Sequence, residues 1–137
     1  MNQLKFQKDL QFGLQSEKDL LPTIRNFFND QTIERTTTKF SANDYFSSNK
    51  RLELKSRTFR YDKYETTMIG LNKVKDAIKF DGEYYFLFKF TDGLYFIKYE
   101  KELFDTFQIK MGGRQDRNIN EFNKYVYIPI EYLEEIQ

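Results

Sequence analysis

The sequence of 137 residues contains no cysteine and no histidine. Without cysteine, the chain has no disulfide bond, no thiolate nucleophile and no zinc–thiolate site. Without histidine, it has no Ser-His-Asp triad and no imidazole that could bind a metal or act as a base. Any chemistry must use carboxylates, Lys, Arg, Tyr, Ser or Thr. Since carboxylate oxygens suit hard cations, a metal bound by this chain would be of the Mg²⁺ or Mn²⁺ kind.

Long apolar runs are also absent. No stretch approaches the roughly 18–20 apolar residues that a membrane span requires. The first residues, MNQLKFQKDLQFG, lack the apolar segment of a secretory signal. We therefore expect a soluble, cytoplasmic protein without a membrane partner. The chain length is typical of about one domain, and no linker or repeat divides it, so residues 1–137 are expected to form a single domain.

The charged residues are unevenly distributed, although the formal net charge is only +1. Residues 50–63 contain six basic residues against Glu53 and Asp62. Such a patch is typical of a surface that binds a polyanion, although an ordinary solvated surface can have the same composition. The segment KMGGRQDRN would suit either a clamp on a nucleic-acid backbone or a solvated turn. The residues expected to contact phosphates are Arg51, Arg57, Arg60, Lys63, Arg114 and Arg117.

Hydrophobic periodicity predicts a chain of mixed α and β elements. Residues 17–28 carry a helical stripe of apolar residues, and Pro22 indicates that the regular helix begins near Asp19. The clearest hairpin is EYYFLFKFTDGLYFIKYE, in which two aromatic-rich strands flank the turn signal Asp92-Gly93. The other expected elements are strands at 32–37, 39–46, 50–57 and 125–130, a helix that has Asn72 as its N-cap and runs to about Lys79, and short helical segments at 101–107 and 131–136. This order predicts an α/β or α+β fold with a central mixed sheet flanked by helices.

Charged and apolar residues alternate along residues 51–57. Glu53 and Lys55 point to one face of the expected strand, with Leu52 and Leu54 on the other. A half-buried strand with a charged outer face would show the same pattern. Alternatively, Asp44 of the preceding strand could share a divalent cation with Glu53, if their carboxylates approach within about 4–5 Å. Phosphodiester cleavage without His or Cys requires such a cation, and Lys55 would lie beside it to position the attacking water.

Asp44 followed by Glu53-Leu54-Lys55, in this order of elements, resembles the PD-(D/E)XK nuclease superfamily, which includes restriction endonuclease-like and Holliday junction resolvase-like proteins. The likeness covers about residues 14–100 and implies an αβββαβ core, with residues 101–137 as an extension. Asn43 stands where many members have Pro. The resemblance implies catalytic roles for Asp44, Glu53, Lys55 and Lys73, and a Mg²⁺ or Mn²⁺ site formed by Asp44, Glu53, the Leu54 carbonyl and Glu17.

The same resemblance implies a metal-dependent DNA endonuclease that reads little sequence and leaves a 5′-phosphate. The substrate would be duplex or branched DNA, and many members of this size act as homodimers. Two alternatives stay open at this point. One is a catalytically silent nucleic-acid-binding or assembly subunit on the same fold. The other is an unrelated α+β interaction module, in which Asp44 and Glu53 would lie far apart.

Overall fold

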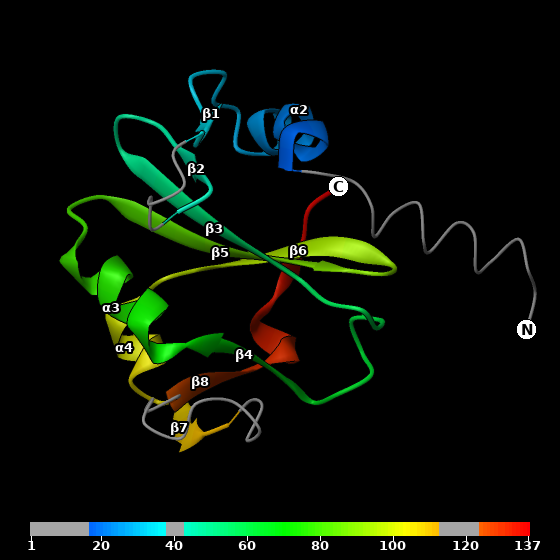
Figure 1. The fold of residues 1–137 in the computed structure, drawn as a ribbon, viewed down its shortest axis with the longest axis vertical. Helices are drawn as coiled ribbons and strands as arrows, with labels where there is room; N and C mark the ends of the chain where they lie inside the picture. Colours follow the sequence, from blue (N-terminus) through cyan, green and yellow to red (C-terminus); the bar gives the residue numbers. More distant parts are fainter. Residues whose placement is uncertain (1–16, 38–42, 113–123) are drawn as a thin grey trace, which may run out of the picture.

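A six-stranded mixed sheet forms the centre of the protein (Figure 1). The computed structural model describes residues 17–37, 43–112 and 124–137. The strands of this sheet follow the order β1 (Glu34–Arg35), β2 (Tyr45–Phe46), β3 (Lys50–Ser56), β5 (Glu83–Phe90), β6 (Gly93–Lys98) and β9 (Glu134–Glu135). The β3–β5 pair is parallel and the other pairs are antiparallel. The predicted fold class, α and β elements around a mixed central sheet, is confirmed.

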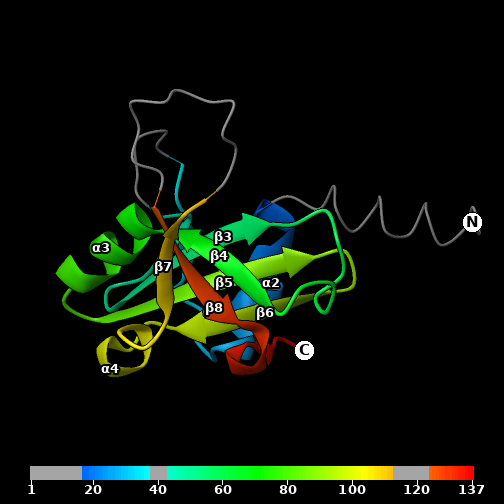
Figure 2. The same ribbon diagram turned by 90° about the horizontal axis from the view of Figure 1, so that it is seen from below.

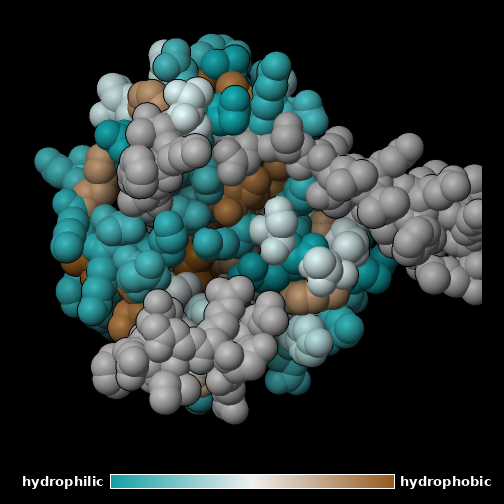
Figure 3. Space-filling view, viewed as in Figure 1, coloured by the Kyte–Doolittle hydropathy of each residue, from teal (hydrophilic) through white to brown (hydrophobic). Residues whose placement is uncertain are grey.

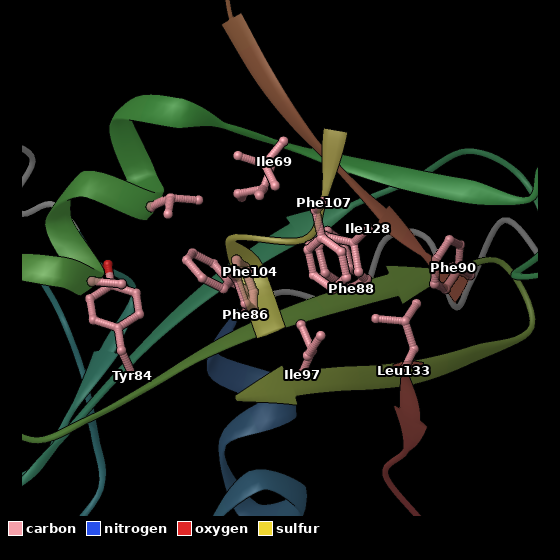
Figure 4. Packing of buried hydrophobic residues seen from close by; sticks show 13 residues of the cluster. Ile69, Tyr84, Phe86, Phe88, Phe90, Ile97, Phe104, Phe107, Ile128 and Leu133 are labelled. Atoms are coloured by element: carbon pink, nitrogen blue, oxygen red, sulfur yellow. The ribbon is translucent and has the colours of Figure 1, made fainter. Parts of the chain in front are cut away.

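Strand β5 lies inside the central sheet and, apart from the buried Lys89, is apolar or aromatic on both faces after Glu83. All of its residues after Glu83 are buried. Phe86 and Phe88 belong to an apolar cluster that extends to β4 (Thr66–Gly70) and α3 (Leu71–Lys79) (Figure 4). Leu87 points the other way, into a second cluster that includes α2 (Glu17–Phe27). The aromatic-rich sequence of β5 therefore holds a layer of the protein on each side of the sheet.

A second sheet, of three strands, covers one face of the central sheet (Figure 2). Its order is β4, β8 (Lys124–Pro129) and β7 (Gln108–Met111), and both pairings are antiparallel. Ile69 of β4 and Ile128 of β8 join the same cluster as Phe86 and Phe88. Hydrophobic periodicity predicts neither β4 nor β7, because each is short and is defined by its pairing with β8 later in the chain.

The helix boundaries differ slightly from the sequence-based expectations. Helix α2 begins at Glu17 rather than near Asp19. Pro22 has no N–H group, so the Lys18 carbonyl lacks its usual helical hydrogen bond. Pro22 and Lys18 are both exposed, so water can bind that carbonyl instead. Helix α3 begins at Leu71 and its N-cap is Gly70, so the prediction of Asn72 as the N-cap is wrong by two positions. No helix among the described residues is long and apolar enough to cross a membrane.

The end of the chain returns to the central sheet. The short helical segment expected at 101–107 is α4 (Lys101–Phe104). The segment expected as helical at 131–136 is instead a 3₁₀ turn (Ile130–Tyr132) followed by β9. Pairing of β9 with the edge of β6 is the reason for this difference, because it draws the last residues into an extended conformation. On the face of the molecule seen in Figure 3, hydrophilic residues cover most of the described surface, and apolar residues show mainly in recessed areas.

The packing between the two sheets predicts which side chains can be shortened to alanine without a large loss of stability. Ile128 is fully buried between them, so Ile128→Ala should lower the free energy of unfolding by about 2–5 kcal/mol. Ile78, in α3, is 60% exposed, and Ile78→Ala should change that energy by only about 0.5 kcal/mol. Urea unfolding of both variants measures the difference. Similar losses in the two variants would show that the second sheet is not packed as described.

Candidate active site

Glu53 and Lys55 of strand β3 point to the covered face of the central sheet. Residues paired across neighbouring strands share a face of the sheet, and Glu53 pairs with Phe86 while Lys55 pairs with Phe88. Both charged side chains therefore leave the sheet on the face that α3 and the second sheet cover. Glu53 is only 4% exposed. The interpretation of β3 as a strand with a charged, solvated outer face is therefore wrong.

Asp44 lies immediately before β2 and binds to β3 through both main chain and side chain. Its N–H donates to the Leu52 carbonyl at 2.9 Å, and its carboxylate accepts a hydrogen bond from the Leu54 N–H at 2.7 Å. The Asp44 carboxyl group also lies in hydrogen-bonding contact with that of Glu53. We call Asp44 and Glu53 the carboxyl pair. Since the structure brings them together, the alternative in which they lie far apart does not hold.

Two lysines from different elements contact the carboxyl pair at Glu53. Lys55 Nζ lies 3.6 Å from Glu53 Oε2, and Lys73 Nζ lies 3.4 Å from Glu53 Oε1. Lys73 is the third residue of α3, which the buried residues Val74 and Ala77 fix against the core. Both lysine side chains are partly exposed, whereas the Glu53 carboxylate is buried. The two ammonium groups therefore lie on the solvent side of Glu53.

Burial raises the pKa of the Glu53 carboxyl group from 4.5 to about 7. The negative charge of Asp44 and a hydrogen bond with it act in the same direction, while the positive charges of Lys73 and Lys55 oppose the rise. Two carboxyl groups in contact do not readily ionise together unless a cation compensates them. With protein groups alone, the carboxyl pair therefore retains a proton close to neutral pH.

The oxygen atoms at this position suit a hard divalent cation. A cation of this kind would replace the retained proton, and it would be held by Asp44, Glu53 and the Leu54 carbonyl. No third acidic side chain joins the carboxyl pair within the part of the chain that the structure describes. The side chain of Glu17, predicted as a further ligand, lies outside that part. The two carboxylates therefore fit a cation site, and the Leu54 carbonyl stays a predicted further ligand.

Tyr84 is a candidate site residue that hydrophobic periodicity does not reveal. It pairs with Arg51 on the face of the sheet that carries Glu53, beside α3 (Figure 4). Its hydroxyl group is buried and has no hydrogen-bond partner among the described residues. Burial raises the pKa of this phenol, and the negative charges of Glu53, Asp76 and Asp44 raise it further. The hydroxyl is thus a donor that a water molecule or a ligand in the site would satisfy.

Two of the predicted phosphate-binding residues make internal contacts. Arg51 donates to the main-chain carbonyls of Ser47, in the turn before β3, and of Lys50, and it lies over the Phe80 ring, 4.4 Å from its centroid. Arg57 is half-buried and donates to the Met68 carbonyl and the Thr67 hydroxyl in β4. Both guanidinium groups therefore tie elements of the fold together. Their predicted contact with a phosphate stays a prediction.

The remaining predicted phosphate-binding residues lie nearer to solvent or outside the described chain. Arg60 is exposed and forms an ion pair of 3.4 Å with Asp92. Lys63 is exposed in the same connection between β3 and β4. Arg114 and Arg117 lie outside the described residues. Arg60 and Lys63 are therefore the basic residues of this group that are best placed to meet a polyanion.

A family model described as “phage putative PDDEXK endonuclease” matches residues 14–136 of the chain. The match covers most of the sequence, so the chain belongs to this family of PD-(D/E)XK nucleases, and the predicted superfamily is confirmed. Comparison with curated proteins and with solved structures gives no match. Membership of the family supports a nuclease acting on a nucleic acid.

The raised pKa of Glu53 predicts how the stability of the metal-free protein depends on pH. Between pH 4.5 and about 7, Glu53 is ionised in the unfolded chain but protonated in the folded protein, so the folded state binds more protons. The stability contributed by this group is therefore full below pH 4.5 and lost as the pH rises through 7, by about 3 kcal/mol.

Urea unfolding in EDTA, at several pH values, measures this loss. The control is Glu53→Gln, which keeps a side chain of the same shape but does not titrate. Wild type should lose stability relative to Glu53→Gln across this pH range. Parallel pH profiles for the two proteins would show that Glu53 ionises normally in the folded state.

Proposed function

We propose that this protein is a metal-dependent DNA endonuclease in which Asp44 and Glu53 hold Mg²⁺ or Mn²⁺. The observation that carries the proposal is the buried Glu53 carboxyl group, with Asp44 beside it and two lysines in contact with it. Burying the Glu53 carboxyl group beside a second carboxyl group is costly, and a single ion pair would suffice if Glu53 only joined α3 to β3. The convergence of these four side chains is better explained by the binding of a cation and a phosphate.

The chemistry assigns a role to each residue of this group. A divalent cation, when bound, would polarise the phosphate and lower the pKa of a water molecule. Lys55 lies on the same face as Glu53, so its ammonium group would hold the attacking water and offset phosphate charge. Lys73 lies in the first turn of α3, where main-chain N–H groups also favour an anion, and would contact the scissile phosphate.

We propose duplex or branched DNA as the substrate, recognised through its backbone with little reading of sequence. The exposed side chains of Arg60 and Lys63 support this proposal, because such groups bind phosphates without distinguishing bases. We also propose that residues 1–137 act as one nuclease domain. A homodimer is proposed from the family resemblance alone.

Cleavage of duplex, branched and single-stranded DNA with Mg²⁺, Mn²⁺ or EDTA tests the proposal. Asp44→Asn and Glu53→Gln keep the side-chain shape and remove a negative charge, so each should lower the single-turnover rate on the order of 10²–10³-fold or more. Lys55→Ala should lower it roughly 10²–10⁴-fold. Because Lys55 is not a metal ligand, its loss should leave Mn²⁺ binding, measured by titration calorimetry, nearly unchanged.

Lys75→Ala is the matched control, because it removes an exposed lysine from the same helix as Lys73. This variant should cleave at the wild-type rate. DNA binding without metal-dependent cleavage by wild type would favour the alternative of a silent binding subunit. A wild-type rate for Lys55→Ala would make Lys55 an ordinary surface lysine.

The basic residues in the connection between β3 and β4 allow a separate prediction about the binding of DNA. If Arg60 and Lys63 each contact a phosphate, the double variant Arg60→Ala/Lys63→Ala should lower the slope of log affinity against log salt by about 0.9 per contact. Lys98→Ala/Lys101→Ala changes the net charge equally at two other exposed positions and should keep the wild-type slope. Fluorescence anisotropy with a labelled duplex in EDTA gives both slopes. Equal slopes for the two double variants would mean that Arg60 and Lys63 are plain surface charges.

A further inference from the structure

A pocket of about 520 Å³ lies beside β3 and β4 and the connection that joins them. Its volume falls within the roughly 300–1,000 Å³ of small-molecule sites in proteins. One part of the wall is aromatic and another is polar. The aromatic residues are Phe59, Tyr64 and Tyr127, and the polar ones are Arg57, Thr66 and Thr67. The pocket can therefore accept a flat group of the size of a nucleobase and offer it both stacking and hydrogen bonds.

The aromatic wall includes a ring that remains open to solvent. Phe59 and Tyr64 meet edge to face, with ring centroids 5.0 Å apart. Tyr64 nevertheless stays 52% exposed, and the Lys63 ammonium group lies 5.5 Å from its ring. An exposed aromatic ring beside a basic side chain is typical of surfaces on which unpaired bases stack while the charge binds the adjoining phosphate.

The polar wall carries a positive charge without an acidic partner. The Arg57 guanidinium donates to the carbonyls of Ser56 and Met68 and to the Thr67 hydroxyl. It forms no ion pair with a carboxylate among the described residues, in contrast to Lys55 and Lys73. The Arg57 guanidinium is thus half-buried and hydrogen-bonded to neutral groups only. Its positive charge therefore attracts an anionic ligand to this wall of the pocket.

The pocket and the carboxyl pair lie along the same two elements. Arg57 comes four residues after Glu53 and continues the pairing of β3 with β5, since its N–H donates to the Lys89 carbonyl. Four residues of a strand span about 13 Å, which equals about four stacked nucleotides at 3.4 Å each. On the other side, β4 leads directly into α3 and Lys73. A DNA strand at the carboxyl pair would therefore pass the pocket within a few nucleotides.

We propose that this pocket binds an unpaired, unstacked base of the DNA strand whose phosphate lies at the carboxyl pair. The inference rests on the proposed nuclease function, because it concerns the strand that is cut. Tyr64 and Phe59 stack on the base, while Thr66, Thr67 and Arg57 bind its polar edge. A base held in a duplex stack cannot enter such a pocket. The preferred substrate is therefore DNA with an unpaired nucleotide near the cut, and not a perfect duplex.

The test compares three labelled DNAs of the same length: a perfect duplex, a duplex with one bulged nucleotide, and the same bulge without its base. Binding is measured by fluorescence anisotropy in EDTA, so that no cleavage occurs. Wild type should bind the bulge at least about fivefold more tightly than the other two DNAs, since stacking of one base gives a factor of this size or more. Tyr64→Ala should lose the preference, and Tyr64→Phe should keep it because the ring remains. Tyr132→Ala, at another exposed aromatic residue, is the matched control and should also keep it.

Equal binding of all three DNAs by wild type, or an unchanged preference in Tyr64→Ala, would overturn the inference. Cleavage with Mg²⁺ separates this failure from failure of the proposed function. If cleavage depends on Glu53 but is equally fast with and without the bulged base, the proposed nuclease function stands and the proposed base-binding pocket is wrong. If wild type prefers the bulge through Tyr64 but cleaves none of the DNAs, the proposed base-binding pocket stands and the proposed nuclease function is wrong. Absence of any DNA binding would overturn both.

Discussion

The burial of the Glu53 carboxyl group beside Asp44 is the constraint on which the arrangement of this protein depends. Two carboxyl groups that lose water and approach each other destabilise a fold unless positive charges or a proton compensate them. Lys55 supplies one charge from the same strand, and Lys73 supplies another from α3. Because Lys73 must reach the solvent side of Glu53, α3 has to lie over this part of β3. The position of the helix is thus part of the chemistry as well as of the packing.

The parallel pairing of β3 with β5 is a second reason why α3 lies over this part of β3. Two parallel strands need a connection that crosses one face of the sheet before the chain returns. Here that connection consists of the segment with Arg60 and Lys63, then β4, then α3. It crosses the face that carries Glu53, so the groups proposed to bind a phosphate and the strand that forms the pocket wall come from one crossover. The core residues that hold the crossover, such as Ile69 and Val74, therefore also set the geometry of the site.

The sequence predicts the members of the site better than their surroundings. Alternation along β3 is enough to place Glu53 and Lys55 on one face, and the resemblance adds Asp44 and Lys73 to the candidate site. Burial of that face is not predictable in the same way, because charged residues on one side of a strand normally indicate solvent. What decides it is the register of β3 with β5, which sets Glu53 beside Phe86. A register between strands that are thirty residues apart leaves no local signal.

Tyr84 and the aromatic pocket escape sequence analysis for a similar reason. Tyr84 begins a stripe that is otherwise phenylalanine, so periodicity marks it as core. The pocket depends on the pairing of β4 with β8, which brings Tyr127 beside Met68. Arg57 is counted among surface charges in the sequence, yet its guanidinium binds main-chain and hydroxyl oxygens of β4. Composition locates a basic segment, but only the tertiary contacts distinguish a structural arginine from an exposed one.

The charges along β3 and α3 indicate that this face can bind a substrate without a metal ion, although cleavage would require one. Lys55, Lys73 and Arg57 carry three positive charges along this face, whereas the carboxyl pair carries at most two negative ones and fewer while it retains a proton. The face therefore stays positive without a metal ion and can attract a phosphate backbone on its own. The proposed stacking of a base on Tyr64 would also be independent of the metal. Under the proposed function, recognition of an unpaired nucleotide would then precede the binding of the cation, and only cleavage would require the cation. Such an order restricts cleavage to DNA that the pocket has already accepted.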